Sequence, residues 1–435
     1  MSASSHPTFR EALRFWLKLG LISFGGPSGQ IAIMHTELVE KKKWIGEERF
    51  LHALNYCMLL PGPEATQLAT YCGWLLHRTW GGIAAGVLFV LPSSLLLWLL
   101  SYVYVAFGQI AWIAAAFAGL KPAVTAIVFA AVWRIGQRTL KTGLLATLAA
   151  AAFVALFFFH APFPAVVATA GAIGFVGGKF FPRWFPAPAM PTATINTAII
   201  DDCATSAGHT RPSWSRACKV LAVSLALWWT PVLAAGLSQG WHSTLVQQGF
   251  FFSKAALVTF GGAYSVLPYV GQQAVETYSW LSTAQMLDGL GLAETTPGPL
   301  IMVLQFVGFL GGWHQPGTLS PLVAATLGAA MTTWTTFVPS FLFIFLGAPH
   351  IEQLRGVAWL NHTLSTVTAA IVGVILNLAV WFELHVFFLT QSAVDWFALA
   401  ICATAFVAIQ RFKVGVIAII FASALLGVVR YGFGL

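Results

Sequence analysis

The sequence Ser23-Phe24-Gly25-Gly26 returns later in the chain as Thr259-Phe260-Gly261-Gly262, 236 positions further on (260 − 24 = 236). A second signature, Pro61-Gly62-Pro63, returns as Pro297-Gly298-Pro299 at the same offset (297 − 61 = 236). Chance identities would scatter over many offsets, so the shared offset indicates an internal duplication. Glycine and proline interrupt helices, and here they stand inside apolar sequence. Helix breakers at matching points of two halves are the pattern of a membrane transporter built from repeats, with its site where the breakers meet.

The composition is that of a membrane protein. Of the 435 residues, 58% are hydrophobic and 8% are charged, whereas a soluble domain carries about 25% charged residues. The stretches 83–107, 110–133 and 320–346 each exceed the roughly 20 apolar residues that a spanning helix needs. The longest polar stretch, 182–216, is rich in Pro, Thr and Ala and is interpreted as a linker. We therefore expect a lipid-embedded bundle and no soluble domain of useful size.

Several other protein classes are excluded by the residues. The net charge of +8 lies in a few short loops, as membrane orientation requires, so no nucleic-acid partner is expected. The five cysteines form no CxxC pair, and the histidines lack metal-binding spacings, so neither a metal nor another cofactor is expected. Gly178-Lys179 lacks the flanking residues of a phosphate-binding loop, which excludes an ATPase. Energy must then come from a gradient or from a partner.

The loops divide into basic loops and loops without Lys or Arg. The positive-inside rule places the basic group in the cytoplasm, which puts the N-terminus inside and the C-terminus outside. The basic group holds Lys41, Lys42, Lys43, Arg49, Arg78, Arg134, Arg138, Lys141, Lys179, Arg183, Arg211, Arg216, Lys219, Arg355, Arg411 and Lys413. The other turns lie near Gly108, His160, Gly240, Glu276, Gln315 and Glu383.

The predicted fold class is an all-α polytopic membrane protein with about nine full spans. Four spans fit between residues 81 and 181, one at 217–237 and four between 320 and 435. Four further segments contain one breaker each and have the same kind of loop at both ends, which predicts re-entrant hairpins or strongly broken helices. These segments are 12–36, 49–78, 246–275 and 283–312.

The single span of the linker region reverses the orientation of the second half of the chain. Two inverted-topology repeats are therefore predicted from the charges alone. The first repeat covers 1–181, the linker with its connecting span covers 182–242, and the second, inverted repeat covers 243–435.

Breakers at membrane depth predict a polar cavity lined by protein, because unpaired backbone groups in a bilayer are costly. Half-helices that begin after Gly26, Pro61 and Pro297 would point free N–H groups and a positive dipole end into it, and such helix starts bind anions. The alternative is that the breakers are packing kinks; their pairing and repetition favour a site. The predicted binding residues at the breakers are Phe24, Gly25, Gly26, Pro27, Pro61, Gly62, Pro63, Phe260, Gly261, Gly262, Pro297, Gly298 and Pro299.

A different glycine pattern is assigned to packing. GxxxG spacings occur at Gly82/Gly86, Gly174/Gly178 and Gly308/Gly312. Small residues at this spacing let two helices approach closely, and this explains them without a functional role.

Ionisable residues at membrane depth are scarce and are site candidates by default. Lys121 lies in the middle of an apolar span beside a proline, and Lys18 and Lys254 precede the two Phe-Gly-Gly breakers. These lysines are candidate anion ligands, the alternative being structural or snorkelling lysines. Glu64 follows the first Pro-Gly-Pro and Glu294 precedes the second, so both are candidates for coupling to protons, the alternative being a carboxylate that is paired or caps a helix.

With these residues the chain resembles the chromate ion transporter family over nearly its whole length, apart from the 182–215 linker. The matching residues of the first half are the stretch 24–32, His35, Trp44, Phe50, the stretches 60–63 and 67–69, and 89–93. Those of the second half are the stretch 260–264, Pro268, Trp280, and the stretches 296–299 and 337–340. One departure is Ala263, which stands where the first copy has Pro27, so the two half-sites are not equivalent.

The resemblance implies efflux of chromate across a bacterial inner membrane, with sulfate as the structural analogue. The residues by themselves indicate a secondary carrier for an anion, and a tetrahedral dianion suits convergent helix starts and lysines. An anion channel, an importer of sulfate-like anions and a membrane-embedded enzyme are the alternatives, and no nucleophile or metal constellation supports the last. Coupling to protons and a homodimeric state stay open.

Overall fold

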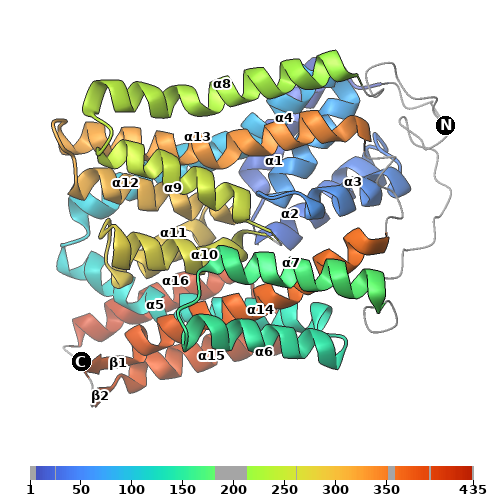
Figure 1. The fold of residues 1–435 in the computed structure, drawn as a ribbon. Helices are drawn as coiled ribbons and strands as arrows, with labels where there is room; N and C mark the ends of the chain where they lie inside the picture. Colours follow the sequence, from blue (N-terminus) through green and yellow to red (C-terminus); the bar gives the residue numbers. More distant parts are fainter. Residues whose placement is uncertain are drawn as a thin grey trace.

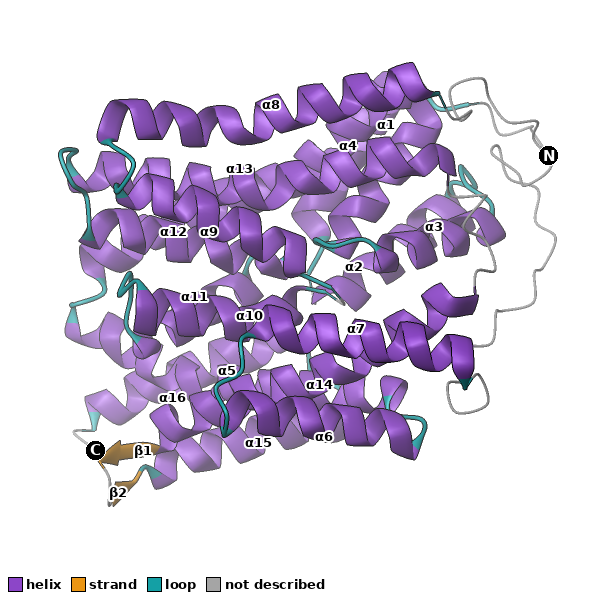
Figure 2. Ribbon diagram, viewed as in Figure 1, coloured by secondary structure: helices purple, strands orange, loops and turns teal. Residues whose placement is uncertain are grey.

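The computed structural model describes residues 6–24, 26–181, 213–260, 262–350, 358–390 and 393–433. In these residues the regular structure is helical, apart from one antiparallel hairpin of the short strands β1 (Phe388–Thr390) and β2 (Ala393–Val394), in which Phe388 pairs with Val394 (Figure 2). The all-α character predicted from the sequence is therefore confirmed for the described part of the chain.

The first half of the chain forms seven α-helices and one π-helical turn, and a connecting helix follows. They are α1 (Phe9–Ile22), α2 (Gly26–His35), η1 (Thr36–Lys41), α3 (Glu47–Leu59), α4 (Glu64–Phe107), α5 (Ala111–Thr139), α6 (Gly143–Phe157), α7 (Phe163–Phe180) and the connecting α8 (Trp214–Gln239).

The second half repeats this order with one extra interruption. Its elements are α9 (Thr244–Val258), α10 (Ala263–Gln272), η3 (Gln273–Thr277), α11 (Thr283–Thr295), the 3-10 turn η4 (Leu300–Met302), α12 (Val303–His314), α13 (Pro321–Gly347), α14 (Ala358–Phe387), α15 (Trp396–Phe412) and α16 (Val416–Gly432).

Helix α4 consists of two helices joined at a kink. His77 and Arg78 have non-helical backbone angles, and the φ of Arg78 is +55°. The kink separates a half-helix that starts at Glu64 from a long apolar span. It lies at the end of the predicted broken segment 49–78, and the extra interruption between α12 and α13 occupies the corresponding place in the second half.

Six stretches are long and apolar enough to cross a membrane, which makes the chain a multi-pass membrane protein. They are Glu64–Phe107, Ala111–Thr139, Phe163–Phe180, Trp214–Gln239, Pro321–His350 and His362–Leu384. Shorter apolar helices lie at Gly143–Phe157, Leu300–His314, Trp396–Phe412 and Val416–Gly432. The long helices lie side by side, and the two ends of the chain lie at opposite ends of the bundle (Figure 1).

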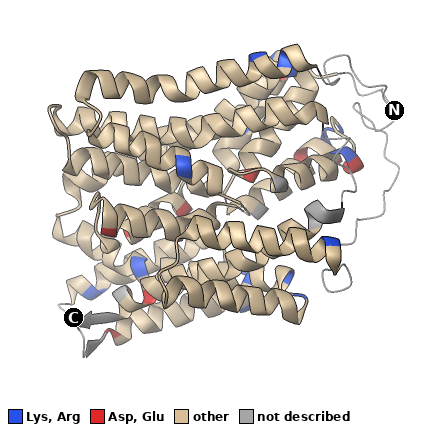
Figure 3. Ribbon diagram, in the orientation of Figure 1, with Lys and Arg blue, Asp and Glu red and all other residues tan. Residues whose placement is uncertain are grey.

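Charged side chains are concentrated at one end of this bundle. Most Lys and Arg residues lie at the end that holds the N-terminus (Figure 3). Arg430 in α16 lies near the C-terminus, where its Nη1 is 3.2 Å from Asp395 Oδ2. This ion pair offsets the charge of a basic residue at the otherwise weakly basic end.

The two halves share local geometry at the offset of 236 residues. Helix α3 and helix α11 begin and end at matching positions, 47 and 283, 59 and 295. Positive φ angles recur in the pairs Gly26/Gly262, Gly62/Gly298 and Lys43/Ser279. The duplication seen in the sequence is thus also a duplication of backbone conformation, including the π-helical turns η1 and η3.

Capping residues explain where several of these helices begin. The Thr8 hydroxyl accepts from the Glu11 N–H while Glu11 accepts from the Thr8 N–H, a capping box at the start of α1. Ser282 and Gln285 form the same arrangement at the start of α11. Such caps satisfy N–H groups that have no partner within the helix.

The GxxxG pairs pack helices closely, as predicted. A methyl group added at Gly174 would lie 2.7 Å from the backbone of Thr363 in α14, and one at Gly312 would lie 2.6 Å from the backbone of Ala324 in α13. Contacts this short leave no room for a side chain. These glycines therefore join α7 to α14 and α12 to α13.

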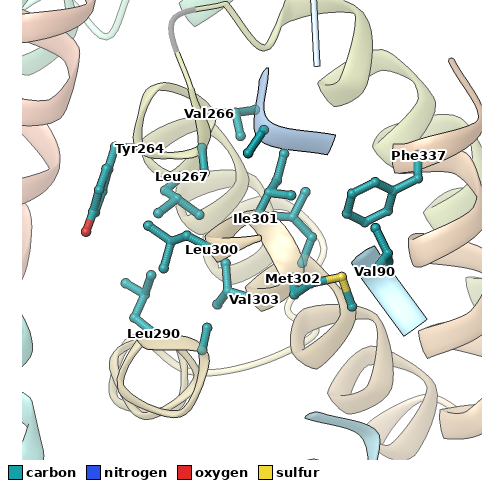
Figure 4. Close-up of a cluster of buried hydrophobic side chains, with 14 of the residues drawn as sticks. Val90, Tyr264, Val266, Leu267, Leu290, Leu300, Ile301, Met302, Val303 and Phe337 are labelled. Carbon is teal, nitrogen blue, oxygen red and sulfur yellow. The ribbon is translucent and has the colours of Figure 1, made fainter. Parts of the chain in front are cut away.

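The core near the second Pro-Gly-Pro is apolar. Leu300, Ile301 and Met302 follow this loop and pack among Leu267 of α10, Leu290 of α11 and other apolar side chains (Figure 4). Leu300 occupies the position that matches Glu64 (300 − 64 = 236). The two half-sites therefore differ in polarity as well as in sequence.

Candidate functional site

The two Pro-Gly-Pro loops are each held by the other half of the chain. The Gly62 N–H donates a hydrogen bond to the Thr259 carbonyl oxygen (2.7 Å), and the Gly298 N–H donates to the Ser23 carbonyl oxygen (2.8 Å). Thr259 and Ser23 open the two Phe-Gly-Gly breakers. All four breakers thus meet in pairs, and each pair joins one half to the other.

This pairing corrects one expectation. The N–H groups of Gly62 and Gly298 were expected to be free for an anion, but both are engaged by carbonyl groups. The reason is that a breaker leaves carbonyl groups as well as N–H groups without helical partners, and the two kinds satisfy each other. Two further predicted residues, Gly25 and Gly261, lie outside the described residues.

A serine from the opposite half closes the space beside each loop. A methyl group added at Gly62 would lie 2.7 Å from Ser340 Oγ in α13, and one added at Gly298 would lie 2.6 Å from Ser93 Cβ in α4. Gly62 has a φ of +119° and Gly298 a φ of +102°, which residues with a Cβ rarely adopt. Only glycine therefore fits at the centre of either loop.

Polar side chains surround the two Pro-Gly-Pro loops, and some of their polar atoms make no hydrogen bond within the described residues. Gln30 donates from Nε2 to the carbonyl oxygens of Gly298 and Ser23 (3.4 Å for the latter), and Gln67 donates from Nε2 to the Pro61 carbonyl oxygen (2.7 Å). Several buried oxygens here have no hydrogen-bond partner among the described residues. They are Ser23 Oγ, Gln30 Oε1, Thr66 Oγ1, Gln67 Oε1, Ser93 Oγ and Ser340 Oγ. Hydroxyl groups in this state are available to donate to water or to an oxyanion.

Glu64 lies where the two Phe-Gly-Gly breakers come together. It is the first residue of α4 and is buried. A methyl group added at Gly262 would lie 4.0 Å from Glu64 Oε1 and 3.9 Å from Pro27 Cγ, so residues of both halves surround this point. Gly262 is the N-cap of α10, and a helix start attracts negative charge. The structure thus brings together three predicted residues, Pro27, Glu64 and Gly262.

Lys121 is paired with a carboxylate that the sequence reasoning did not select. Its Nζ lies 3.8 Å from Asp288 Oδ1, and the Tyr104 O–H donates to Asp288 Oδ2 (2.9 Å). The Asp288 side chain is 5% exposed and that of Lys121 is 27% exposed. A signal was available, because Asp288 is an acidic residue in the middle of a helix whose one other charged residue is Glu294, near its end.

Glu294 forms a similar unit six residues further along α11. The Tyr264 O–H donates to Glu294 Oε1 (2.5 Å), and Arg134 of α5 acts electrostatically on both residues. Glu294 is 8% exposed and Tyr264 is 6% exposed. Glu294, which was predicted to be a coupling residue, is therefore a buried carboxylate whose hydroxyl donor, Tyr264, follows the second Phe-Gly-Gly motif by two residues.

Lys18 and Lys254 are not brought to this centre. Both side chains are exposed, on the outer faces of α1 and α9. The neighbouring residues on each helix, Leu19 and Ala255, are buried. The two lysines match in position between the halves, and the structure places neither against the breaker loops.

A cavity of about 580 Å³ lies away from the breakers, at the kink of α4. It is lined by Phe9, Leu76, His77, Arg78 and Trp80. The breaker loops themselves are closely packed, as the short distances at Gly62 and Gly298 require. Both loops are therefore tightly packed at their central glycines.

Sequence comparisons place these motifs in a known group of proteins. A sequence model described as Chromate transporter matches residues 10–175 and 246–428, which together cover most of the chain. No solved structure matches significantly.

Related proteins match along most of their length. A chromate transport protein of Cupriavidus metallidurans is 30% identical over 376 residues, which are 85% of this chain and 81% of that protein. A chromate transport protein of Pseudomonas aeruginosa is 32% identical over 83% of this chain and 77% of its own length. A probable chromate transport protein of Synechococcus elongatus is 26% identical over 85% and 84%, respectively.

Proposed function

The chain belongs to the chromate transporter family, and we propose that it is a secondary active transporter that exports chromate, or a sulfate-like oxyanion, across a bacterial inner membrane. Members of this family are transporters and not enzymes. The observation that carries the proposal is the crossed pairing of breakers, in which Gly62 bonds to Thr259 and Gly298 bonds to Ser23. Broken helices that meet between two repeats are where secondary transporters bind substrate.

The anion is proposed to bind at the starts of α2 and α10, close to the paired loops. Helix α2 starts at Gly26 and α10 starts directly after Gly262. Both glycines have a positive φ, and a methyl group added at Gly26 would have no atom within 4 Å. The buried hydroxyl groups of Ser93 and Ser340 offer donors nearby. Helix starts and hydroxyl donors suit the oxygens of a tetrahedral dianion.

Glu64 gives this site a means of coupling to protons. Its carboxylate lies at the start of α10, where it repels an anion while it is charged. Anion binding at that point then requires Glu64 to be neutral or displaced. Protonation of Glu64 would in this way accompany binding of the anion, and loss of that proton would accompany its release.

Two inverted repeats, 1–181 and 243–435, are proposed to build this site, with α8 as the connecting span and the N-terminus in the cytoplasm. The predicted total is about nine full spans and four broken segments. Support comes from the opposite positions of the two chain ends in the bundle and from the basic end of the molecule (Figure 3). An odd number of crossings is what places the two ends on opposite sides.

Uptake of radiolabelled chromate into everted membrane vesicles tests the proposed export, because the cytoplasmic face of such vesicles points outward. Accumulation should require the chain and should change when a proton gradient is imposed. Vesicles without the chain, and vesicles in which the gradient is collapsed, are the controls. Accumulation in right-side-out vesicles instead would identify an importer, and single-channel currents in a planar bilayer would identify an anion channel.

A further inference from the structure

Helix α11 presents two buried carboxylates on the face that packs against α5. Asp288, Gly291 and Glu294 are spaced by three residues, so each is a neighbour of the next on the helix surface and Gly291 lies between the two carboxylates. A methyl group added at Gly291 would lie 3.2 Å from Val124 Cγ2 of α5, so the two helices are in close contact between the carboxylates. Asp288 and Glu294 thus lie along one seam between α5 and α11.

Each carboxylate on this seam accepts a hydrogen bond from one tyrosine. Asp288 accepts from Tyr104 and forms an ion pair with Lys121 of α5, whereas Glu294 accepts from Tyr264 and is acted on electrostatically by Arg134 of α5. The hydrogen bond from tyrosine is longer at Asp288 (2.9 Å) than at Glu294 (2.5 Å). Asp288 Oδ1 is buried without a hydrogen bond among the described residues and lies 3.8 Å from the ammonium group.

The charge of Asp288 depends on Lys121. A buried carboxylate is costly unless an opposite charge compensates it. Helices α4, α5, α12, α14 and α16 all pack against α11, and in the described part of the chain the titratable groups that act on Asp288 are Lys121 and Tyr104. Lys121, which is partly exposed, is therefore the only described cation that balances it.

We propose that Asp288 is a second coupling carboxylate, which exchanges its partner Lys121 for a proton when a transported oxyanion binds Lys121. This inference rests on the proposed function of the chain as an anion transporter. An oxyanion that draws the Lys121 ammonium group away leaves Asp288 uncompensated in an apolar seam. Asp288 then takes up a proton from the solvent, and the lost ion pair becomes a neutral acid beside the Tyr104 hydroxyl group.

Linked protonation has a measurable signature. When a group binds one proton together with the ligand, ligand affinity rises as the pH falls, by up to about tenfold per pH unit. Sulfate is the suitable probe because it stays fully ionised between pH 6 and 8, whereas chromate itself takes up a proton near neutrality. The binding of radiolabelled sulfate to the purified full chain in lipid nanodiscs should therefore strengthen from pH 8 to pH 6.

Two substitutions test whether Asp288 exchanges Lys121 for a proton or only stabilises the fold. Asp288→Asn is expected to bind sulfate more tightly at pH 8 than the unmodified chain does at that pH, and to lose the part of the pH dependence that this exchange supplies. Lys121→Met is expected to weaken binding by tenfold or more at every pH. The matched control is Asp395→Asn, which also removes a carboxylate from an ion pair, with Arg430, and should keep the full pH dependence.

The possible results distinguish failure of the proposed exchange from failure of the proposed transport function. Full pH dependence in Asp288→Asn, or unchanged affinity in Lys121→Met, would overturn the exchange while leaving anion transport intact. No sulfate or chromate binding by the unmodified chain at any pH would instead overturn the proposed function. If Asp288→Asn fails to fold, Tyr104→Phe replaces it: removing a donor to the charged carboxylate should move the pH dependence to higher pH, and an unmoved curve would refute the exchange.

Discussion

Adding a single methyl group at Gly62 tests whether the crossed loops hold the two halves together. Gly62→Ala places a Cβ on a backbone with a φ of +119°, which costs about 1–3 kcal/mol of strain. The same Cβ lies 2.7 Å from Ser340 Oγ and 2.9 Å from Gln67 Nε2, and overpacking of this kind costs about 1–3 kcal/mol. Together the variant should lose about 2–6 kcal/mol of stability.

A matched control separates the cost of the positive φ from the cost of the short contacts made by the added methyl group. Gly317 in the loop before α13 has a φ of +63° and no atom within 4 Å of an added methyl group. Gly317→Ala should therefore cost about 1–2 kcal/mol. Thermal midpoints of the purified proteins in detergent should rank the unmodified chain first, Gly317→Ala second and Gly62→Ala last.

A second substitution tests whether Ser340 Oγ is the atom that an added methyl group at Gly62 contacts. Adding Ser340→Ala to Gly62→Ala removes the clashing oxygen and should recover about 1–3 kcal/mol. Ser93→Ala should recover less in Gly298→Ala, because Ser93 Cβ, the nearest atom at 2.6 Å, stays in place. Anion transport in vesicles should be fastest for the unmodified chain, slower for Gly317→Ala and slowest for Gly62→Ala. Equal midpoints for Gly62→Ala and Gly317→Ala, or rescue by Ser93→Ala but not by Ser340→Ala, would refute the crossed arrangement.

Further predictions concern charge and topology. Lys121→Met should reduce chromate transport about tenfold or more while the protein still inserts, because the site loses a partly buried cation; normal transport would assign Lys121 a structural role. Glu64→Gln should abolish the dependence of transport on the proton gradient while chromate exchange persists, and Glu294→Gln should do the same if both carboxylates couple. Gradient dependence that survives in both variants would make the membrane potential the driving force. In intact cells, Gln315→Cys should react with an impermeant thiol reagent, and Lys42→Cys should react only after the cells are opened; the reverse pattern would contradict the inverted repeats.

The positions of the helix breaks could be predicted because they depend on local chemistry. Proline and glycine act on their own backbone, so the breaks at Gly26, Gly62, Gly262 and Gly298 appear where the sequence places them. Hydrophobic length can also be read along the chain, and it predicted the all-helical, membrane-embedded class of the protein. The family resemblance rested on the same motifs and is confirmed.

The partners of these residues could not be predicted in the same way. The bond from Gly62 to Thr259 joins positions 197 residues apart (259 − 62 = 197), and no periodicity in the sequence records it. Whether a lysine is buried, as Lys121 partly is, or exposed, as Lys254 is, depends on which face of its helix the neighbours cover. Asp288 lies in the middle of α11, away from the breakers, and the sequence does not record that its side chain faces Lys121.

The crossed loops also determine how long parts of the first half wait for their hydrogen-bonding partners during synthesis. The Ser23 carbonyl group enters the membrane early, but its partner, the Gly298 N–H, is made 275 residues later (298 − 23 = 275). At the roughly 5–20 residues per second of protein synthesis, this wait lasts about 14–55 s. During that time the amino-terminal half carries broken helices whose backbone groups lack their final partners, so water or the insertion machinery must supply substitutes. Chains cut after Thr295 should accordingly be degraded faster in a pulse–chase experiment than chains cut after His314, which carry the second loop. Quality control at the membrane would then act on the first half until the second Pro-Gly-Pro loop has been synthesised.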